Sequence, residues 1–204
     1  MSLTIRLQSI KCLREGDDEV ALEEPYVLVT SVSLQRPILP NLFLPNLQVF
    51  PYRVWDDFDG DEVTLNSGAS FWDTELQPRN IANPDEVIFA VTLMQNDHGN
   101  PDQYRSLVLG AAGASMVATL GVPNRTVKVK RLLDDIRRAI DSACGPRLFD
   151  DNHVGTEELR LDASDLIPFG TRDKWLTISG DEGHYELAFR IRRLAACPAG
   201  EASG

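Results

Sequence analysis

The chain has 204 residues, which allows one large domain and leaves little room for two full catalytic domains. With 43% hydrophobic and 25% charged residues, its composition is that of an ordinary globular protein and excludes a disordered, collagen-like or coiled-coil chain. Twenty Lys and Arg against thirty-one Asp and Glu give a formal net charge of −11, which repels phosphate backbones and argues against nucleic-acid partners.

The cysteines and the N-terminal residues indicate in which cellular compartment the protein is expected. Cys12, Cys144 and Cys197 are odd in number and widely spaced, so neither a disulfide framework nor a zinc knuckle is indicated, and a reducing compartment fits. No basic segment followed by an apolar run opens the chain. We therefore expect a cytoplasmic protein, or one exported without a recognisable signal peptide.

The first half of the sequence predicts strands. Residues 3–12 alternate and then change phase, as a strand with a bulge does, and residues 25–32 are rich in β-branched and aromatic side chains. Four prolines between positions 37 and 51 exclude a helix and indicate an extended excursion along a sheet edge. Segments 48–55 and 62–65 flank an Asp- and Gly-rich turn and predict a hairpin.

The second half predicts a central strand, two helices and three further strands. Residues 87–94 are almost continuously apolar, as in a strand buried on both faces. Residues 129–144 place apolar side chains on one helical face, with Thr126 as the N-cap, and residues 104–120 form a second helix. That second helix is expected to be buried, because its weakly polar stretch is shorter than the about 20 residues that span a bilayer. Strands are predicted at 156–161, 174–178 and 184–192.

These elements together predict a mainly β fold, an antiparallel β-sandwich with an inserted α-helical hairpin at about 102–146. We expect a single domain over residues 1–195 and a flexible tail over 196–204.

Oxygen-bearing side chains gather after predicted strands. If the fold brings those strand ends together, the clusters supply the hard ligands and the coordination number that Ca²⁺ requires. The three clusters are Asp17, Asp18 and Glu24; Gln95, Asn96 and Asp97; and Asp150, Asp151 and Asn152.

Three short motifs carry a resemblance to a known family. Glu-Pro-Tyr-Val at 24–27, the apolar strand ending at 93–97 and Asp-Asn-His-Val-Gly at 151–155 resemble motifs of C2 domains. The resemblance covers most of residues 1–35 and 85–195 and implies a C2-like sandwich. Asn-Asp-x-Gly-Asn-Pro-Asp at 96–102 is also similar to uncharacterised bacterial proteins with a helical insertion, which supplies no function.

The C2 resemblance implies a calcium site. Carried over by motif, its positions fall on Asp18, Glu24, Gln95, Asp97 and Asn152, with Asp151 adjacent. C2 domains that bind calcium carry Asp at most of these positions, so Glu, Gln and Asn here imply weaker binding. The last two motifs are also separated by about fifty residues instead of a few.

Other interpretations of the same residues stay open. The acidic loops also fit plain turns, and His98 and His153 with Asp97 and Asp151 also fit a zinc or acid–base site of a metal-assisted hydrolase. No Gly-x-Ser-x-Gly motif or phosphate-binding glycine loop is present in the sequence. A binding module is therefore favoured over an enzyme.

The predicted insertion offers a second binding surface. Six positive charges lie between residues 125 and 138, which suits an anionic membrane surface or a protein partner, although Asp134, Asp135 and Asp141 also fit an ordinary solvated face. The sequence thus predicts a non-enzymatic binding module with weak Ca²⁺ binding and partner engagement through the insertion. A metal-free interaction or toxin-associated subunit remains the other alternative, and the sequence leaves the oligomeric state open.

Overall fold

The computed structural model describes residues 2–15, 24–34, 46–52, 63–64, 69–72, 81–96, 100–144, 151–167, 170–181 and 183–194. Eight strands and two α-helices lie within these ranges, with short 3-10 helices at Pro84–Glu86 and Ala163–Leu166. The strands are β1 (Ser2–Glu15), β2 (Pro25–Ser33), β3 (Asn46–Tyr52), β4 (Val63–Thr64), β5 (Val87–Gln95), β6 (Asn152–Glu158), β7 (Thr171–Gly180) and β8 (Gly183–Leu194), and the helices are α1 (Pro101–Ala118) and α2 (Arg125–Ala143).

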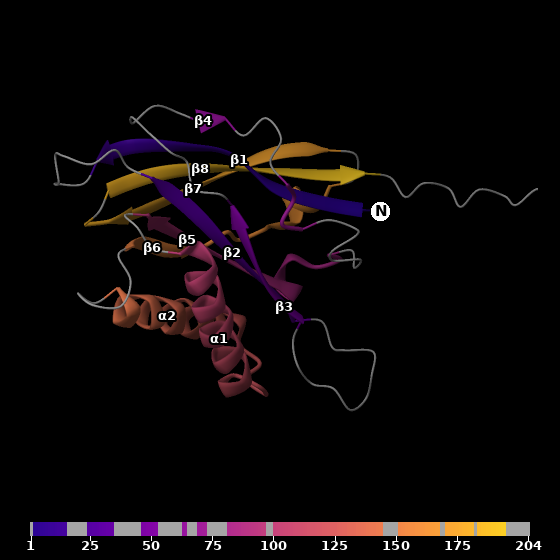
Figure 1. Cartoon of the computed structure of the whole chain (residues 1–204). Helices are drawn as coiled ribbons and strands as arrows, with labels where there is room; N and C mark the ends of the chain where they lie inside the picture. The colour runs from indigo at the N-terminus through magenta and orange to yellow at the C-terminus, as the bar shows by residue number, and fades with distance from the viewer. Residues whose placement is uncertain are drawn as a thin grey trace, which may run out of the picture.

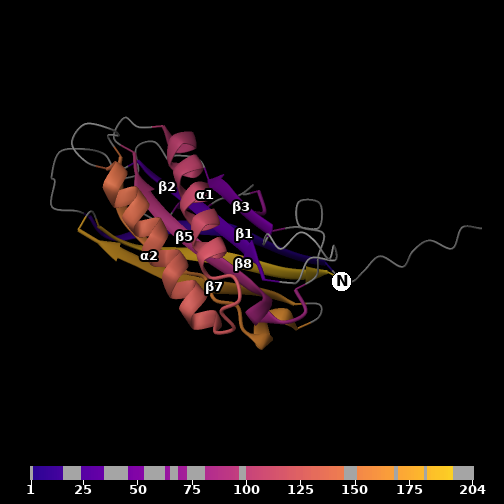
Figure 2. The same cartoon turned by 90° about the horizontal axis from the view of Figure 1, so that it is seen from below.

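The strands form two four-stranded antiparallel sheets. We call the sheet of order β4-β1-β8-β7 the outer sheet and the sheet of order β3-β2-β5-β6 the inner sheet. Figure 1 shows three layers, with α1 and α2 covering the inner sheet on the side away from the outer sheet, and Figure 2 shows both helices lying across that face. The predicted antiparallel sandwich with an inserted helical hairpin is confirmed, and it is compatible with the C2 resemblance.

The inner sheet is the central layer because its sequence is apolar on both faces. All nine residues of β2 are buried, as are the first eight of β5. Alternate side chains belong to two separate hydrophobic cores. Val27, Val29 and Phe89 pack toward the outer sheet, while Leu28 and Ile88 pack toward the helices. The prediction of a central strand at 87–94 is confirmed.

The outer sheet buries only one face. Leu3, Ile5 and Leu7 of β1 are in the core between the sheets, and Tyr185, Leu187, Phe189 and Ile191 continue that face on β8. The register between β1 and β8 shifts between Leu7 and Ser9, which confirms the bulge indicated by the change of phase. Polar residues between these apolar positions face away from the core.

The helical hairpin differs from the prediction in two details. Asn124 is the N-cap of α2 instead of Thr126, because the Asn124 side chain accepts hydrogen bonds from the amides of Thr126 and Val127. α1 is buried on one face only, since Leu109 and Val117 are 43% and 53% exposed. Within the described part of the chain, no helix is long and apolar enough to cross a membrane.

The predicted hairpin of segments 48–55 and 62–65 is wrong. β3 pairs with β2 at the edge of the inner sheet, whereas β4 pairs with β1 in the outer sheet. The two segments have separate long-range partners that local turn chemistry does not reveal. The Asp-rich turn at 56–61 lies outside the described residues.

The two sheets approach closely where β6 passes β7. A Cβ on Gly180 would lie 2.1 Å from the carbonyl oxygen of Val154, and one on Gly155 would lie 2.8 Å from Cγ2 of Ile178. Position 180 therefore requires glycine, because the obstacle is backbone, whereas a side chain at position 155 would require Ile178 to move. β6 also starts at Asn152, four residues before the predicted strand at 156–161.

Candidate functional site

The strand register brings three of the predicted loop segments to one end of the inner sheet. Pro25 of β2 pairs with Gln95 of β5, and Gln95 pairs with Asn152 of β6. Glu24, Gln95, Asp151 and Asn152 therefore lie at neighbouring strand ends. Asp18, Asp97 and His98 lie outside the described residues, and among the described ones no group of three His, Cys, Asp or Glu side chains could hold a metal ion.

These residues divide between the two faces of the inner sheet. Directly paired residues share a face, so Gln95 and Asn152 point to the same side. Asn96, the next residue, donates from its side-chain amide to a Glu24 carboxylate oxygen at 2.9 Å, and its backbone amide donates to the Glu24 carbonyl at 3.0 Å. The Glu24 carboxylate is thus held at the end of β2 by the residue that follows β5.

Two side-chain oxygens at this end have no hydrogen-bond partner. Oε1 of Gln95 and Oδ1 of Asn96 are both buried and unpaired within the described part of the structure. The orientation of the Asn96 amide follows from its contact with Glu24, because only the NH₂ group can donate to a carboxylate. Buried carbonyl oxygens without a donor are costly, and a cation is one of the groups that can satisfy them.

Asp151 performs a different task from the one that its position in the motif implies. Its side chain is fully buried, and the Tyr26 hydroxyl donates to its carboxylate at 2.8 Å while the Tyr104 hydroxyl donates to its backbone carbonyl at 3.3 Å. Burial, reinforced by the bond to Asp151, raises the pKa of Tyr26 far above its usual range. This network joins β2, α1 and the start of β6, so the Asp151 carboxylate lies in the helix-facing core.

His153 is fully engaged within the fold. Its Nδ1 lies 2.7 Å from an Asp141 carboxylate oxygen of α2, and its Nε2 lies 3.0 Å from the Thr156 hydroxyl. The order carboxylate, imidazole, hydroxyl is that of a catalytic triad. However, Thr156 is fully buried and its hydroxyl also lies 3.0 Å from that of Thr92. These contacts therefore connect α2 to β6, and both ring nitrogens of His153 are already occupied by them.

Most of the positive charge of the insertion is neutralised by neighbouring carboxylates. Arg125 pairs with Glu158 at 2.5 Å, and Arg137 pairs with Glu157 at 2.7 Å, which links α2 to β6. Arg131 and Arg138 both contact Asp135 at 2.7 Å. Four of the six cations that the sequence marks are thus paired, and the basic face is weaker than it looks in the sequence.

No family model matches the sequence, and no curated protein matches it. Among solved structures, human GIVD cytosolic phospholipase A2 in complex with methyl gamma-linolenyl fluorophosphonate is similar, with a TM-score of 0.44 and 12% identity over 96% of this chain and 17% of that chain. The same enzyme with this inhibitor and terbium chloride gives a TM-score of 0.43 and 13% identity over the same shares. This chain therefore spans about a sixth of the length of those chains.

Proposed function

We propose that this protein is a non-enzymatic binding module that holds Ca²⁺ weakly at the ends of β2, β5 and β6. The observation that carries the proposal is that Oε1 of Gln95 and Oδ1 of Asn96 are both buried and unpaired at this end of the inner sheet, where Asn96 also holds the Glu24 carboxylate. All three are hard oxygen ligands, which is the chemistry that Ca²⁺ selects. Asn152 lies beside Gln95 in the register, and we add Asp18, which precedes β2 in the sequence, and Asp97, which follows β5, to the proposed ligand set.

Weak affinity is part of the proposal. The Asp151 carboxylate accepts a hydrogen bond from Tyr26, and Gln95 and Asn152 are amides at positions where a tight site would have carboxylates. Fewer anionic ligands lower the affinity for Ca²⁺. We therefore propose binding that depends on Glu24 together with Asp18 and Asp97.

Calorimetric titration with CaCl₂ tests the site. The wild-type protein is expected to give saturable heat and a higher melting temperature with Ca²⁺, because a ligand that binds the folded state stabilises it. Glu24→Gln keeps an acceptor for the Asn96 amide while removing the charge, and it should weaken binding about tenfold, as should Asp97→Ala. Glu186→Gln, on the outer sheet, is the matched control. Absence of heat and of any change in melting temperature for the wild type would refute the proposal.

The second part of the proposed function is engagement of a protein partner or an anionic membrane surface through the α1–α2 hairpin. Leu109 and Val117 on α1 and Leu120 in the turn are 43%, 53% and 50% exposed, so the hairpin presents large apolar side chains to solvent. Arg125, next to this turn, donates to the carbonyl of Val87, so the turn lies near the start of β5. Glu24 and Asn96 lie at the opposite end of β5. The two proposed binding surfaces are therefore separate.

Liposome flotation with and without Ca²⁺ distinguishes the two kinds of partner. Flotation with anionic vesicles that is lost in Leu120→Ser and Val117→Ser would assign the hairpin to a membrane surface. Gln103→Ser, on the exposed first turn of α1, is the control. Unchanged flotation of the serine variants, or none in any sample, would contradict the membrane version and leave the protein partner as the proposal.

A further inference from the structure

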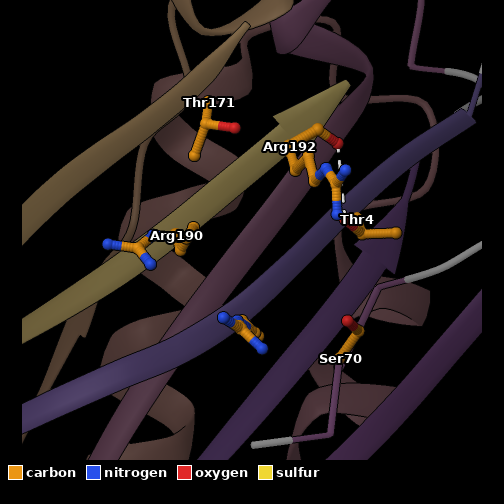
Figure 3. Close-up of a pocket in the computed structure, with 6 residues that line it drawn as sticks. Thr4, Ser70, Thr171, Arg190 and Arg192 are labelled. Carbon is orange, nitrogen blue, oxygen red and sulfur yellow. Dashed lines mark hydrogen bonds between the residues drawn. The ribbon is translucent and has the colours of Figure 1, made fainter. Parts of the chain in front are cut away.

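A pocket lies on the open face of the outer sheet, on the side of the sandwich opposite to the helices. Its volume is about 430 Å³, which is within the range of small-molecule sites. Figure 3 shows the side chains that enter it from three neighbouring strands, with Arg192 beside Thr4. The lining residues are Thr4, Arg6, Ser70, Thr171, Arg190 and Arg192.

The strand register explains why these residues meet. On the open face, Thr171 of β7, Arg192 of β8 and Thr4 of β1 are directly paired and form one row across the sheet. Asp173, Arg190 and Arg6 form the next row in the same way. Two rows of side chains on paired strands therefore line the pocket, and Ser70 is added from the segment beside Trp72, which bridges to β1.

These two rows of side chains hold an excess of positive charge. Arg190 donates to both oxygens of Asp173, at 2.8 and 2.9 Å, and this contact lowers the pKa of Asp173. Arg6 stands directly opposite Arg190 and donates to the Gln8 side chain at 3.2 Å. Like charges in opposed cross-strand positions destabilise a sheet. Three guanidinium groups thus face one carboxylate in these two rows, within a chain whose net charge is −11.

We propose that this pocket binds the phosphate group of a phosphate ester. Guanidinium groups match phosphate oxygens in shape and charge, and the hydroxyls of Thr4, Ser70 and Thr171 add neutral donors. A phosphate monoester carries close to two negative charges and three strong acceptor oxygens, which balances the excess charge of the two rows. A single planar carboxylate has only two oxygens and one charge, so it would leave most of these donors unused.

Titration calorimetry with sodium phosphate and with glycerol 3-phosphate, at constant ionic strength, tests the proposal. Saturable binding and a raised melting temperature are expected. Arg192→Gln and Arg6→Gln should each weaken binding about tenfold, since each removes a charge-assisted hydrogen bond. Arg193→Gln removes the same charge one residue away on the other face of β8, and it should leave binding unchanged.

A variant with the opposite effect guards against loss of folding as an explanation. Asp173→Asn removes the carboxylate that competes for Arg190, so it should tighten phosphate binding severalfold. An equal loss in Arg192→Gln and Arg193→Gln would overturn the proposal, because it would show only general charge attraction. No binding of any phosphate compound to the wild type would overturn it as well.

The source of the phosphate is decided by a second arm. Vesicles of phosphatidylcholine with and without phosphatidic acid are sedimented with the wild type and with Arg192→Gln. Binding to the phosphatidic acid vesicles that depends on Arg192 assigns the pocket to a lipid headgroup. Binding of glycerol 3-phosphate without vesicle binding assigns it to a small phosphorylated solute. Both results support a phosphate site, and failure of both arms rejects it.

Discussion

The inner and outer sheets are built from the same number of strands but are used differently. The inner sheet is covered on both faces, by the outer sheet and by the helices, so its side chains are committed to packing. The outer sheet is covered on one face and presents alternating polar side chains on the other. A covered sheet can offer ligands only at its strand ends, whereas an open sheet can offer its whole face. The proposed Ca²⁺ site lies at strand ends of the inner sheet, and the proposed phosphate pocket lies on the open face of the outer sheet.

The largest expected difference between the sheets is in tolerance to truncation. Leu28→Ala removes a fully buried side chain from the helix-facing core and should destabilise the protein by about 2–5 kcal/mol. Trp175→Ala, on the open face of β7, should cost only about 1 kcal/mol, because the indole is already 56% exposed. Urea unfolding of both variants measures the contrast, and similar losses would show that the outer face is covered in solution.

The contact between the sheets should tolerate no added side chain. Gly180→Ala places a methyl group where Val154 already stands, so β6 and β7 must separate, at a cost of about 1–3 kcal/mol. Gly110→Ala is the control, because nothing lies within 4 Å of a Cβ there and alanine favours the helix. Thermal unfolding of the two variants gives opposite shifts if the contact is as close as described.

Asp151 tests whether a position of the C2-like motif supports packing or metal binding. Asp151→Ala leaves the buried Tyr26 hydroxyl without an acceptor and should cost about 1–3 kcal/mol in stability. Combined with Tyr26→Phe, part of that loss should be recovered, because no unpaired hydroxyl remains. A double-variant cycle in chemical unfolding measures this coupling, and fully additive losses would contradict the network.

The smallest expected effect is a pH dependence that arises at the surface. Hydrogen bonds from Ser164 and Lys174 lower the pKa of Asp162, and hydrogen bonds from Arg190 lower that of Asp173. Because these pKa values are lower in the folded state, the stabilisation is present above about pH 4 and is lost as the pH falls through the folded values. The urea midpoint of Asp162→Ala should therefore fall less steeply between pH 5 and pH 2 than that of the wild type.

The fold could be predicted as far as local periodicity determines it. The apolar run at 87–94 predicts a strand covered on both faces, and the alternation at 184–192 predicts one open face, because burial dictates both patterns. The partners of β3 and β4 could not be predicted, since pairing depends on contacts between segments far apart in the chain.

The sites divide along the same line. Oxygen-rich residues after strands do gather at one end of the inner sheet, as the sequence indicates. The face that each one takes depends on register and on the irregularity beside Leu93, so the inward turn of Asp151 was not foreseeable. The arginine pocket was missed because Arg6 and Arg190 are 184 positions apart and meet only through the pairing of β1 with β8.

The helical hairpin is inserted between β5 and β6, which are neighbouring strands of the inner sheet. The chain leaves the inner sheet after Gln95 and returns at Asn152, and these residues are directly paired across β5 and β6. A short turn could join them, so the insertion is dispensable for connectivity. Its loss would uncover Leu28, Ile88 and Met94 as a broad water-repelling surface. Deleting the hairpin should therefore make the protein aggregate, even with every strand in place.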